Sequence, residues 1–114
     1  MVKTNNSGCI VTYVGLIRDR SHGKPVLSVE YTDADGKSRE RLQKIVTEAR
    51  EKWQINDLAI HHRIGELEVG DINLVVAVSS AHRKESFAAC QYVISQFKKK
   101  LPTQKKETYQ DGSI

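Results

Sequence analysis

The order of hydrophobic patterns along the chain is the feature that most limits its fold. Two amphipathic patterns, with apolar residues three or four positions apart, predict a first helix after Ser38 and a second helix after Ala81. Runs rich in β-branched and aromatic residues predict strands at residues 9–17, 25–32, 58–64 and 72–79. The resulting strand–strand–helix–strand–strand–helix order predicts an α+β domain, with both helices packed on one side of a mostly antiparallel sheet.

Local signals place the ends of the predicted helices. The segment Asp33–Gly36 has the composition of a turn, and Ser38 is a candidate N-cap for the first helix. The second helix is predicted to open at His82 and Arg83, and Pro102 prevents its continuation.

Length and composition indicate one globular domain over residues 1–114. The longest aliphatic run, Leu74–Val78, is far shorter than the roughly 20 apolar residues of a membrane-spanning helix. The polar start at Val2–Ser7 does not have the pattern of a secretion signal. Because Cys9 and Cys90 are too few for a disulfide framework, we expect a cytoplasmic protein.

The chain carries 18 Lys and Arg residues against 14 Asp and Glu residues, and its formal net charge is +4. Part of this excess is concentrated around the end of the second predicted helix, in Lys98, Lys99, Lys100, Lys105 and Lys106. The cluster favours an anionic partner. Cations in the last turn of a helix also stabilise the helix dipole without any ligand, so the cluster alone does not identify a site.

Basic residues occur at three boundaries between predicted elements, where a rigid scaffold can present side chains to a ligand. Arg18 follows the first strand, His82 and Arg83 open the second helix, and Lys98–Lys106 closes it. Free backbone N–H groups at a helix start, together with an imidazole and a guanidinium, can hold a phosphate. The alternative is that Ser80 caps the helix and leaves His82 and Arg83 in solvent.

Two of the lysines are separated by a change in chain direction. Because Pro102 redirects the chain, Lys98 and Lys105 can face one pocket from two directions. A lysine among like charges has its ammonium form disfavoured, which makes proton exchange easier. The hypothesis is that these lysines both bind an anion and exchange protons.

A metal site, a nucleotide cofactor and a reactive thiol are not indicated. His61 and His62 are neighbours on a predicted strand and point to opposite faces, and no typical metal-ligand spacing occurs in the sequence. Cys9 and Cys90 lie among apolar residues, which favours small core residues over nucleophiles. The sequence has no glycine-rich phosphate loop, so a dinucleotide or ATP is not indicated.

Four segments carry a specific resemblance when they are taken together. They are residues 11–19 (VTYVGLIRD), 62–71 (HRIGELEVGD), 79–83 (SSAHR) and 98–107 (KKKLPTQKKE). In this order and spacing they resemble the catalytic large subunit of molybdopterin synthase, the MoaE family, over about residues 8–112. The resemblance implies an α/β hammerhead fold. It also implies an enzyme that transfers sulfur to cyclic pyranopterin monophosphate and so forms the dithiolene of molybdopterin.

The resemblance further implies partners and residue roles. A small ubiquitin-like subunit would donate the sulfur from a C-terminal Gly-Gly thiocarboxylate, and the large subunit would form a homodimer within a heterotetramer. No cofactor, nucleic acid or membrane would take part. Lys98 and Lys105 would be catalytic. The residues implied in substrate binding are Leu16, Ile17, Arg18, His82, Arg83, Lys98, Lys105, Lys106 and Glu107.

The sequence departs from the family pattern at two internal places. Gln104 replaces a common aromatic residue beside the second lysine, and Asp33–Gly36 replaces a segment that usually contains Tyr and Met. The tail that family members usually carry after the position of Gly112 is not in this sequence. Two alternatives stay open: a non-catalytic relative that keeps the fold and carrier binding, and a small basic nucleic-acid-binding module. Few aromatic residues accompany the lysines, which gives base stacking little support.

Overall fold

The computed structural model describes residues 5–114, which form two α-helices and seven β-strands. The helices are α1 (Ser38–Lys52) and α2 (Arg83–Lys99). The strands are β1 (Cys9–Leu16), β2 (Arg20–Ser21), β3 (Lys24–Thr32), β4 (Asp57–His62), β5 (Gly65–Glu68), β6 (Ile72–Ser80) and β7 (Gln104–Tyr109). The molecule is elongated and measures 51 × 27 × 21 Å.

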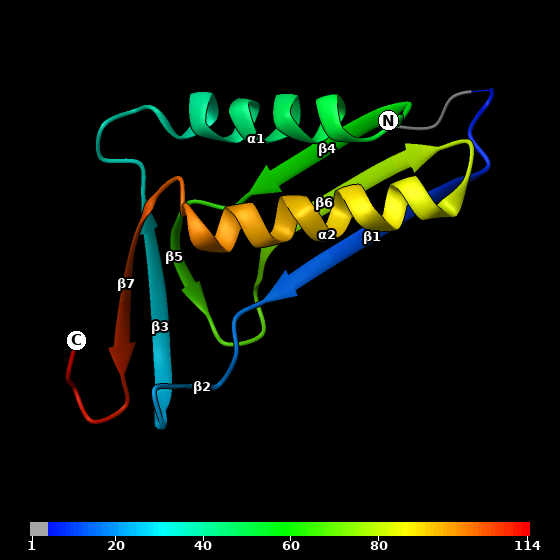
Figure 1. Ribbon diagram of the computed structural model, residues 1–114. Coiled ribbons are helices and arrows are strands. Elements are labelled where there is room, and N and C mark those ends of the chain that lie inside the picture. The colour runs from blue at the N-terminus through cyan, green and yellow to red at the C-terminus, as the bar shows by residue number, and fades with distance from the viewer. Residues whose placement is uncertain (1–4) are drawn as a thin grey trace.

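Strands β1, β6 and β4 form an antiparallel sheet with β6 in the centre, and both helices pack on one face of it (Figure 1). Alternate residues of a strand share a face, and on β6 Leu74, Val76 and Val78 point toward the helices and are almost fully buried. The helices complete this core with Ile45, Ala49, Ala89, Cys90, Val93 and Phe97.

The remaining strands form a second sheet at one end of the molecule (Figure 1). β3 is its central strand, with β5 and β7 paired to the same stretch of β3 and β2 paired to its first residues. A separate core lies on this sheet and consists of Ile17, Val26, Val29, Tyr31 and Leu67. Leu101 packs against both cores and so connects them.

The predicted α+β class and the packing of both helices on one side of a sheet are confirmed, although the strands divide between two sheets. Three strands lie where none was predicted. β7 has no apolar alternation and is held by its backbone pairing with β3, and β5 contributes one buried side chain, Leu67. β2 belongs to a hairpin whose turn residues, His22 and Gly23, have φ of 52° and 76°. Two positive φ values are typical of a two-residue hairpin turn.

The prediction that Ser38 caps the first helix is wrong. Ser38 is the first residue of α1, and the N-cap position belongs to Lys37, which makes no side-chain capping bond. The carboxylate of Asp33 takes over this role: it accepts hydrogen bonds from the backbone N–H of Ser38 at 3.1 Å and from its hydroxyl at 2.7 Å. An acceptor from the preceding turn therefore satisfies one of the free N–H groups at the start of the helix.

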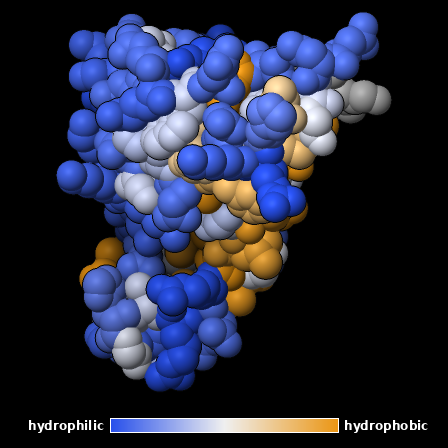
Figure 2. Space-filling view, turned by 45° about the vertical axis from the view of Figure 1, so that its right-hand side comes forward, coloured by the Kyte–Doolittle hydropathy of each residue, from blue (hydrophilic) through white to orange (hydrophobic). Residues whose placement is uncertain are grey.

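Apolar side chains are exposed on the sheet face that points away from the helices. Ile10 and Val14 alternate with the inward-facing residues of β1 and are 45 and 47% exposed. Figure 2 shows an apolar surface on one side of the molecule, bordered by hydrophilic regions. Such surfaces often contact another protein chain. Within residues 5–114, neither helix has the length and apolar character needed to cross a membrane.

We expect the second sheet to depend on Leu67, which is fully buried in the smaller core. Leu67→Ala removes most of that side chain and should lower the free energy of unfolding by about 2 to 5 kcal/mol. Urea unfolding measures this change. The matched control is Leu27→Ala, because Leu27 lies on the adjacent strand β3 and is 57% exposed. Equal losses of stability in the two variants would contradict the assignment of this core.

Candidate functional site

A cavity of about 520 Å³ opens between the second sheet and the end of α2. Its apolar and aromatic lining is formed by Leu16, Ile17, Val29, Tyr31, Phe97 and Leu101. Its polar lining is formed by Arg18, Arg20, Ser21, Asn73, Lys98, Lys105 and Glu107. Segments far apart in the sequence therefore meet around one space.

The cavity carries an excess of positive charge. Arg18, Arg20, Lys98 and Lys105 line it, and Glu107 is the only acidic residue among its lining residues. All four basic residues are exposed, so their charged groups can reach a ligand from solvent. Guanidinium and ammonium groups arranged in this way favour binding of a phosphate or a carboxylate.

The end of β1 is fixed by backbone hydrogen bonds, and this places Arg18 at the cavity. The N–H of Ile17 donates to the carbonyl of Asp71 at 3.0 Å, and the N–H of Gly70 donates to the carbonyl of Ile17 at 2.9 Å. The side chain of Ile17 is buried in the smaller core. Arg18 follows Ile17 directly, so these hydrogen bonds fix the backbone position from which the Arg18 side chain extends.

Strand alternation along β7 decides which of its charged residues face the cavity. Lys105 and Glu107 lie two positions apart and share the cavity face, with 3.9 Å between the Lys105 Nζ and a carboxylate oxygen of Glu107. Lys106 pairs in register with Glu30, an exposed residue on β3, and does not line the cavity. The predicted grouping of Lys106 with Lys105 in one pocket is therefore not found.

A half-buried histidine, His62, contacts two aromatic residues of the cavity lining. The His62 ring makes edge-to-face contacts with Tyr31 and Phe97, each with 4.8 Å between ring centroids. His62 Nδ1 lies 3.2 Å from the carbonyl oxygen of Asn73, and Nε2 lies 2.9 Å from the hydroxyl of Thr103. Because a carbonyl can only accept, neutral His62 carries its proton on Nδ1 and accepts a hydrogen bond from Thr103 at Nε2.

Burial shifts the pKa values of two groups beside the cavity. It lowers the pKa of His62, an effect that the hydrogen bonds with Asn73 partly oppose. It raises the pKa of the Tyr31 hydroxyl, and the negative charge of Glu107 raises that pKa further. Both side chains are therefore held in their neutral forms. A neutral aromatic surface beside basic groups suits a ligand that combines a flat ring with an anionic substituent.

The predicted site residues do not all meet within one chain. Leu16, Ile17, Arg18, Lys98, Lys105 and Glu107 line the cavity. His82 and Arg83 instead lie at the opposite end of α2, whose 17 residues correspond to about 25 Å of helix. His82 lines a different cavity, of about 270 Å³. Three basic segments were predicted to meet at one site. Within a single chain, two of them meet at the cavity, through Arg18 and through Lys98 and Lys105, and the third, His82 and Arg83, does not.

Sequence reasoning missed several lining residues. Arg20 and Ser21 lie between the strands predicted at residues 9–17 and 25–32, where no strand is predicted, although His22-Gly23 before a strand is a recognisable turn signal. Tyr31 fits the alternating pattern of its strand, and Phe97 fits the helical pattern. Such patterns indicate burial, and no signal in them indicates that the same rings also line a cavity.

The residues considered for metal and thiol chemistry are dispersed. Among residues 5–114, no three His, Cys, Asp or Glu side chains are grouped as metal ligands. His61 is exposed whereas His62 is half-buried, which confirms that they occupy opposite faces of β4. Cys90 belongs to the larger core, and burial raises the pKa of its thiol. Cys9 is half-buried at the start of β1.

Fold and cavity together define a small α+β protein with a basic, aromatic-lined cavity. Comparison with known proteins identifies its family. The family model described as MoaE protein matches residues 1–100. The molybdopterin synthase catalytic subunit of Nostoc sp. is 42% identical over 108 residues, which are 94% of this chain and 66% of that relative. The subunit of the same name from Pyrococcus abyssi is 37% identical and covers 100% of this chain and 77% of its own length.

Solved structures give the same result. The crystal structure of molybdopterin synthase from Staphylococcus aureus matches with a TM-score of 0.88 and 34% identity, over 97% of this chain and 81% of that chain. This likeness confirms the predicted fold class. The chain belongs to the MoaE family.

The half-buried imidazole of His62 predicts a pH dependence of stability. Because its pKa is lowered in the folded chain, the unfolded chain binds a proton at a pH where folded His62 remains neutral. The free energy of unfolding should therefore decrease as the pH falls below about 6.5, the usual histidine pKa. Urea unfolding at a series of pH values measures this slope.

Two variants separate His62 from the other titrating groups. His62→Gln should reduce the slope between about pH 7 and pH 5, where a histidine titrates. His61→Gln, which alters an exposed histidine on the other face of β4, should leave the slope in place. An unchanged slope in His62→Gln would contradict the prediction.

Proposed function

We propose that this chain is the catalytic subunit of a molybdopterin synthase. It would transfer sulfur from a thiocarboxylated small carrier protein to cyclic pyranopterin monophosphate and so form the molybdopterin dithiolene. The observation that carries the proposal is that Lys98 and Lys105 line one cavity together with Arg18. Membership of the MoaE family and relatives named molybdopterin synthase catalytic subunit support it.

The basic lining suggests how the charges of this reaction are managed. The guanidinium of Arg18 would bind the substrate phosphate, with Arg20 beside it in the cavity lining. Lys98 would stabilise the oxyanion that forms at the carrier carbonyl when sulfur is transferred. Lys105, with Glu107 nearby, would assist proton transfer as the cyclic phosphate opens. No step in this scheme is assigned to a metal or another cofactor.

The partners follow from the family resemblance and the shape of the site. A ubiquitin-like subunit would place its C-terminal Gly-Gly thiocarboxylate in the open cavity, beside Lys98. Two copies of this chain would form a homodimer, with one small subunit bound to each, in the cytoplasm. The exposed apolar side chains Ile10 and Val14 offer a surface for contact between protein chains. Neither a nucleic acid nor a membrane is proposed as a partner.

A homodimer would also give His82 and Arg83 a route to a substrate site. Both are exposed and separated from Lys98 of their own chain by the length of α2. If they contact substrate, they do so in the cavity of the second copy. We therefore propose that each complete site combines Lys98 and Lys105 of one chain with His82 and Arg83 of its partner.

Lys98→Ala should remain folded and lose product formation by about 10² to 10³-fold, as expected when a preorganised charge at the reacting atoms is removed. The measurement is molybdopterin formation from the precursor and thiocarboxylated carrier. Lys99→Ala is the matched control, since Lys99 is the next lysine on the same exposed helix end and does not line this cavity. Near-normal turnover by Lys98→Ala would reject the proposed role.

Shared sites predict that two inactive variants complement each other. His82→Ala and Lys98→Ala should each be impaired, and mixing them under conditions of subunit exchange should restore about a quarter of normal activity, because half of the dimers are mixed and each has one intact site. A mixture no more active than the mean of the separate variants would show that the site does not combine these residues across the dimer.

A further inference from the structure

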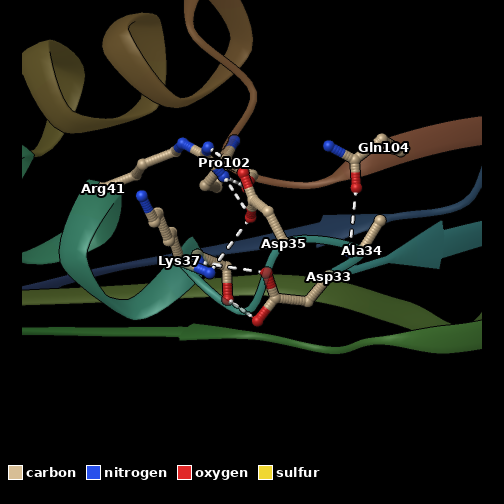
Figure 3. Close-up of polar contacts among 8 residues, drawn as sticks. Asp33, Ala34, Asp35, Lys37, Arg41, Pro102 and Gln104 are labelled. Atoms are coloured by element: carbon tan, nitrogen blue, oxygen red, sulfur yellow. Dashed lines mark hydrogen bonds and ion pairs between the residues drawn. The ribbon is translucent and has the colours of Figure 1, made fainter.

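A side chain on α1 connects two loops beside the cavity (Figure 3). Arg41 Nη1 donates hydrogen bonds to the carbonyl oxygen of Pro102 and to Asp35 Oδ1, each at 3.0 Å. Arg41 Nη2 donates to Asp35 Oδ2. The turn between β3 and α1 (residues 33–37) is thereby joined to the connection between α2 and β7 (residues 100–103). We call Asp35, Arg41 and Pro102 the Arg41 clasp.

A second contact joins the same parts of the chain. The backbone N–H of Ala34 donates to the side-chain oxygen of Gln104 at 3.0 Å (Figure 3). This bond directly joins the turn of residues 33–37 to the first residue of β7.

The clasp keeps its charges over the working pH range of proteins. The hydrogen bond from Arg41 lowers the pKa of Asp35 to about 2, and the backbone N–H of Lys37 contributes to this shift. Asp35 therefore stays ionised in any neutral or mildly acidic solution. The contact is a fixed support and not a pH-sensitive one.

The supported connection lies between the two cavity lysines. Lys98 precedes Pro102 by four residues, and Lys105 follows it by three. Pro102 and Thr103 are both buried, and the hydroxyl of Thr103 also contacts His62 Nε2 at 2.9 Å. The position of this short backbone segment therefore sets how Lys98 and Lys105 approach the same space.

We propose that Arg41 is a positioning residue for the cavity: it acts through Pro102 to hold the ammonium groups of Lys98 and Lys105 in their working arrangement. The inference rests on the proposed function for its kinetic consequence only. A planar guanidinium is required, because one Lys ammonium does not reproduce a fork that binds a carboxylate and a carbonyl together.

Arg41→Ala and Arg41→Lys test the proposal in the full chain, assayed with thiocarboxylated carrier and pterin precursor. Both variants should lower kcat by about tenfold or more while KM changes much less, because small displacements of reacting groups chiefly affect the chemical step. Arg41→Lys keeps the charge and the aliphatic stem, so it remains informative if Arg41→Ala fails to fold. Normal kcat per folded molecule in Arg41→Lys would overturn the requirement for the guanidinium.

Arg50→Ala is the matched control. Arg50 lies on the same helix and donates to Asp57 at 2.7 Å, and the two ion pairs have nearly equal side-chain exposure: 40 and 42% for Arg41 and Asp35, 43 and 42% for Arg50 and Asp57. Loss of the Arg50 pair should leave kcat unchanged. Equal effects of Arg41→Ala and Arg50→Ala would show that Arg41 contributes only general stability.

A spectroscopic measurement tests positioning without using activity. After reductive ¹³C-methylation of the lysines, the NMR signals of Lys98 and Lys105 should shift in Arg41→Lys and remain unshifted in Arg50→Ala. Unchanged signals in Arg41→Lys would overturn the inference. If the unaltered chain makes no molybdopterin, the proposed function fails while this comparison still decides whether Arg41 positions the lysines.

Discussion

The pairing of β7 with β3 is the interaction on which the candidate site depends. β7 has few apolar side chains and is held to the second sheet by a ladder that runs from Val26 to Thr32 of β3. The pairing returns the chain to the cavity after α2 and brings Lys105 to the same space as Lys98. Without this ladder, Lys98 and Lys105 would not be held at the same cavity. Backbone hydrogen bonds, rather than side-chain packing, therefore assemble the basic lining.

The larger core could be predicted from the sequence, whereas the smaller sheet could not. The periodic apolar residues of β6 and α2, such as Val76 and Cys90, form the centre of the larger core. β2, β5 and β7 are short or polar. β5 and β7 owe their strand conformation to pairing with β3, which is distant from them in the sequence, whereas β2 pairs with β3 across a two-residue turn. The capping role of Asp33 was missed for a related reason, since Ser38 has the preferred residue type but the folded turn presents a better placed carboxylate.

The site was predictable to the extent that basic residues occur at element boundaries. Arg18 and Lys98 line the cavity at the ends of β1 and α2, where the sequence predicts element boundaries. Alternate residues of a strand share a face, which explains why Lys105 and not Lys106 faces the cavity. Sequence spacing did not reveal that the ends of α2 are too far apart for His82 to join them. The position of an element boundary in the sequence does not give its distance from other boundaries in space. Here the length of α2 sets that distance.

The cavity lies across the junction between two hydrophobic cores of unequal size. The smaller one contains five buried side chains and the larger one ten, with Leu101 in contact with both. Local opening in proteins tends to follow such divisions, since one unit can loosen while the other stays intact. Local opening of the smaller core would therefore widen the binding space while the larger core stays packed.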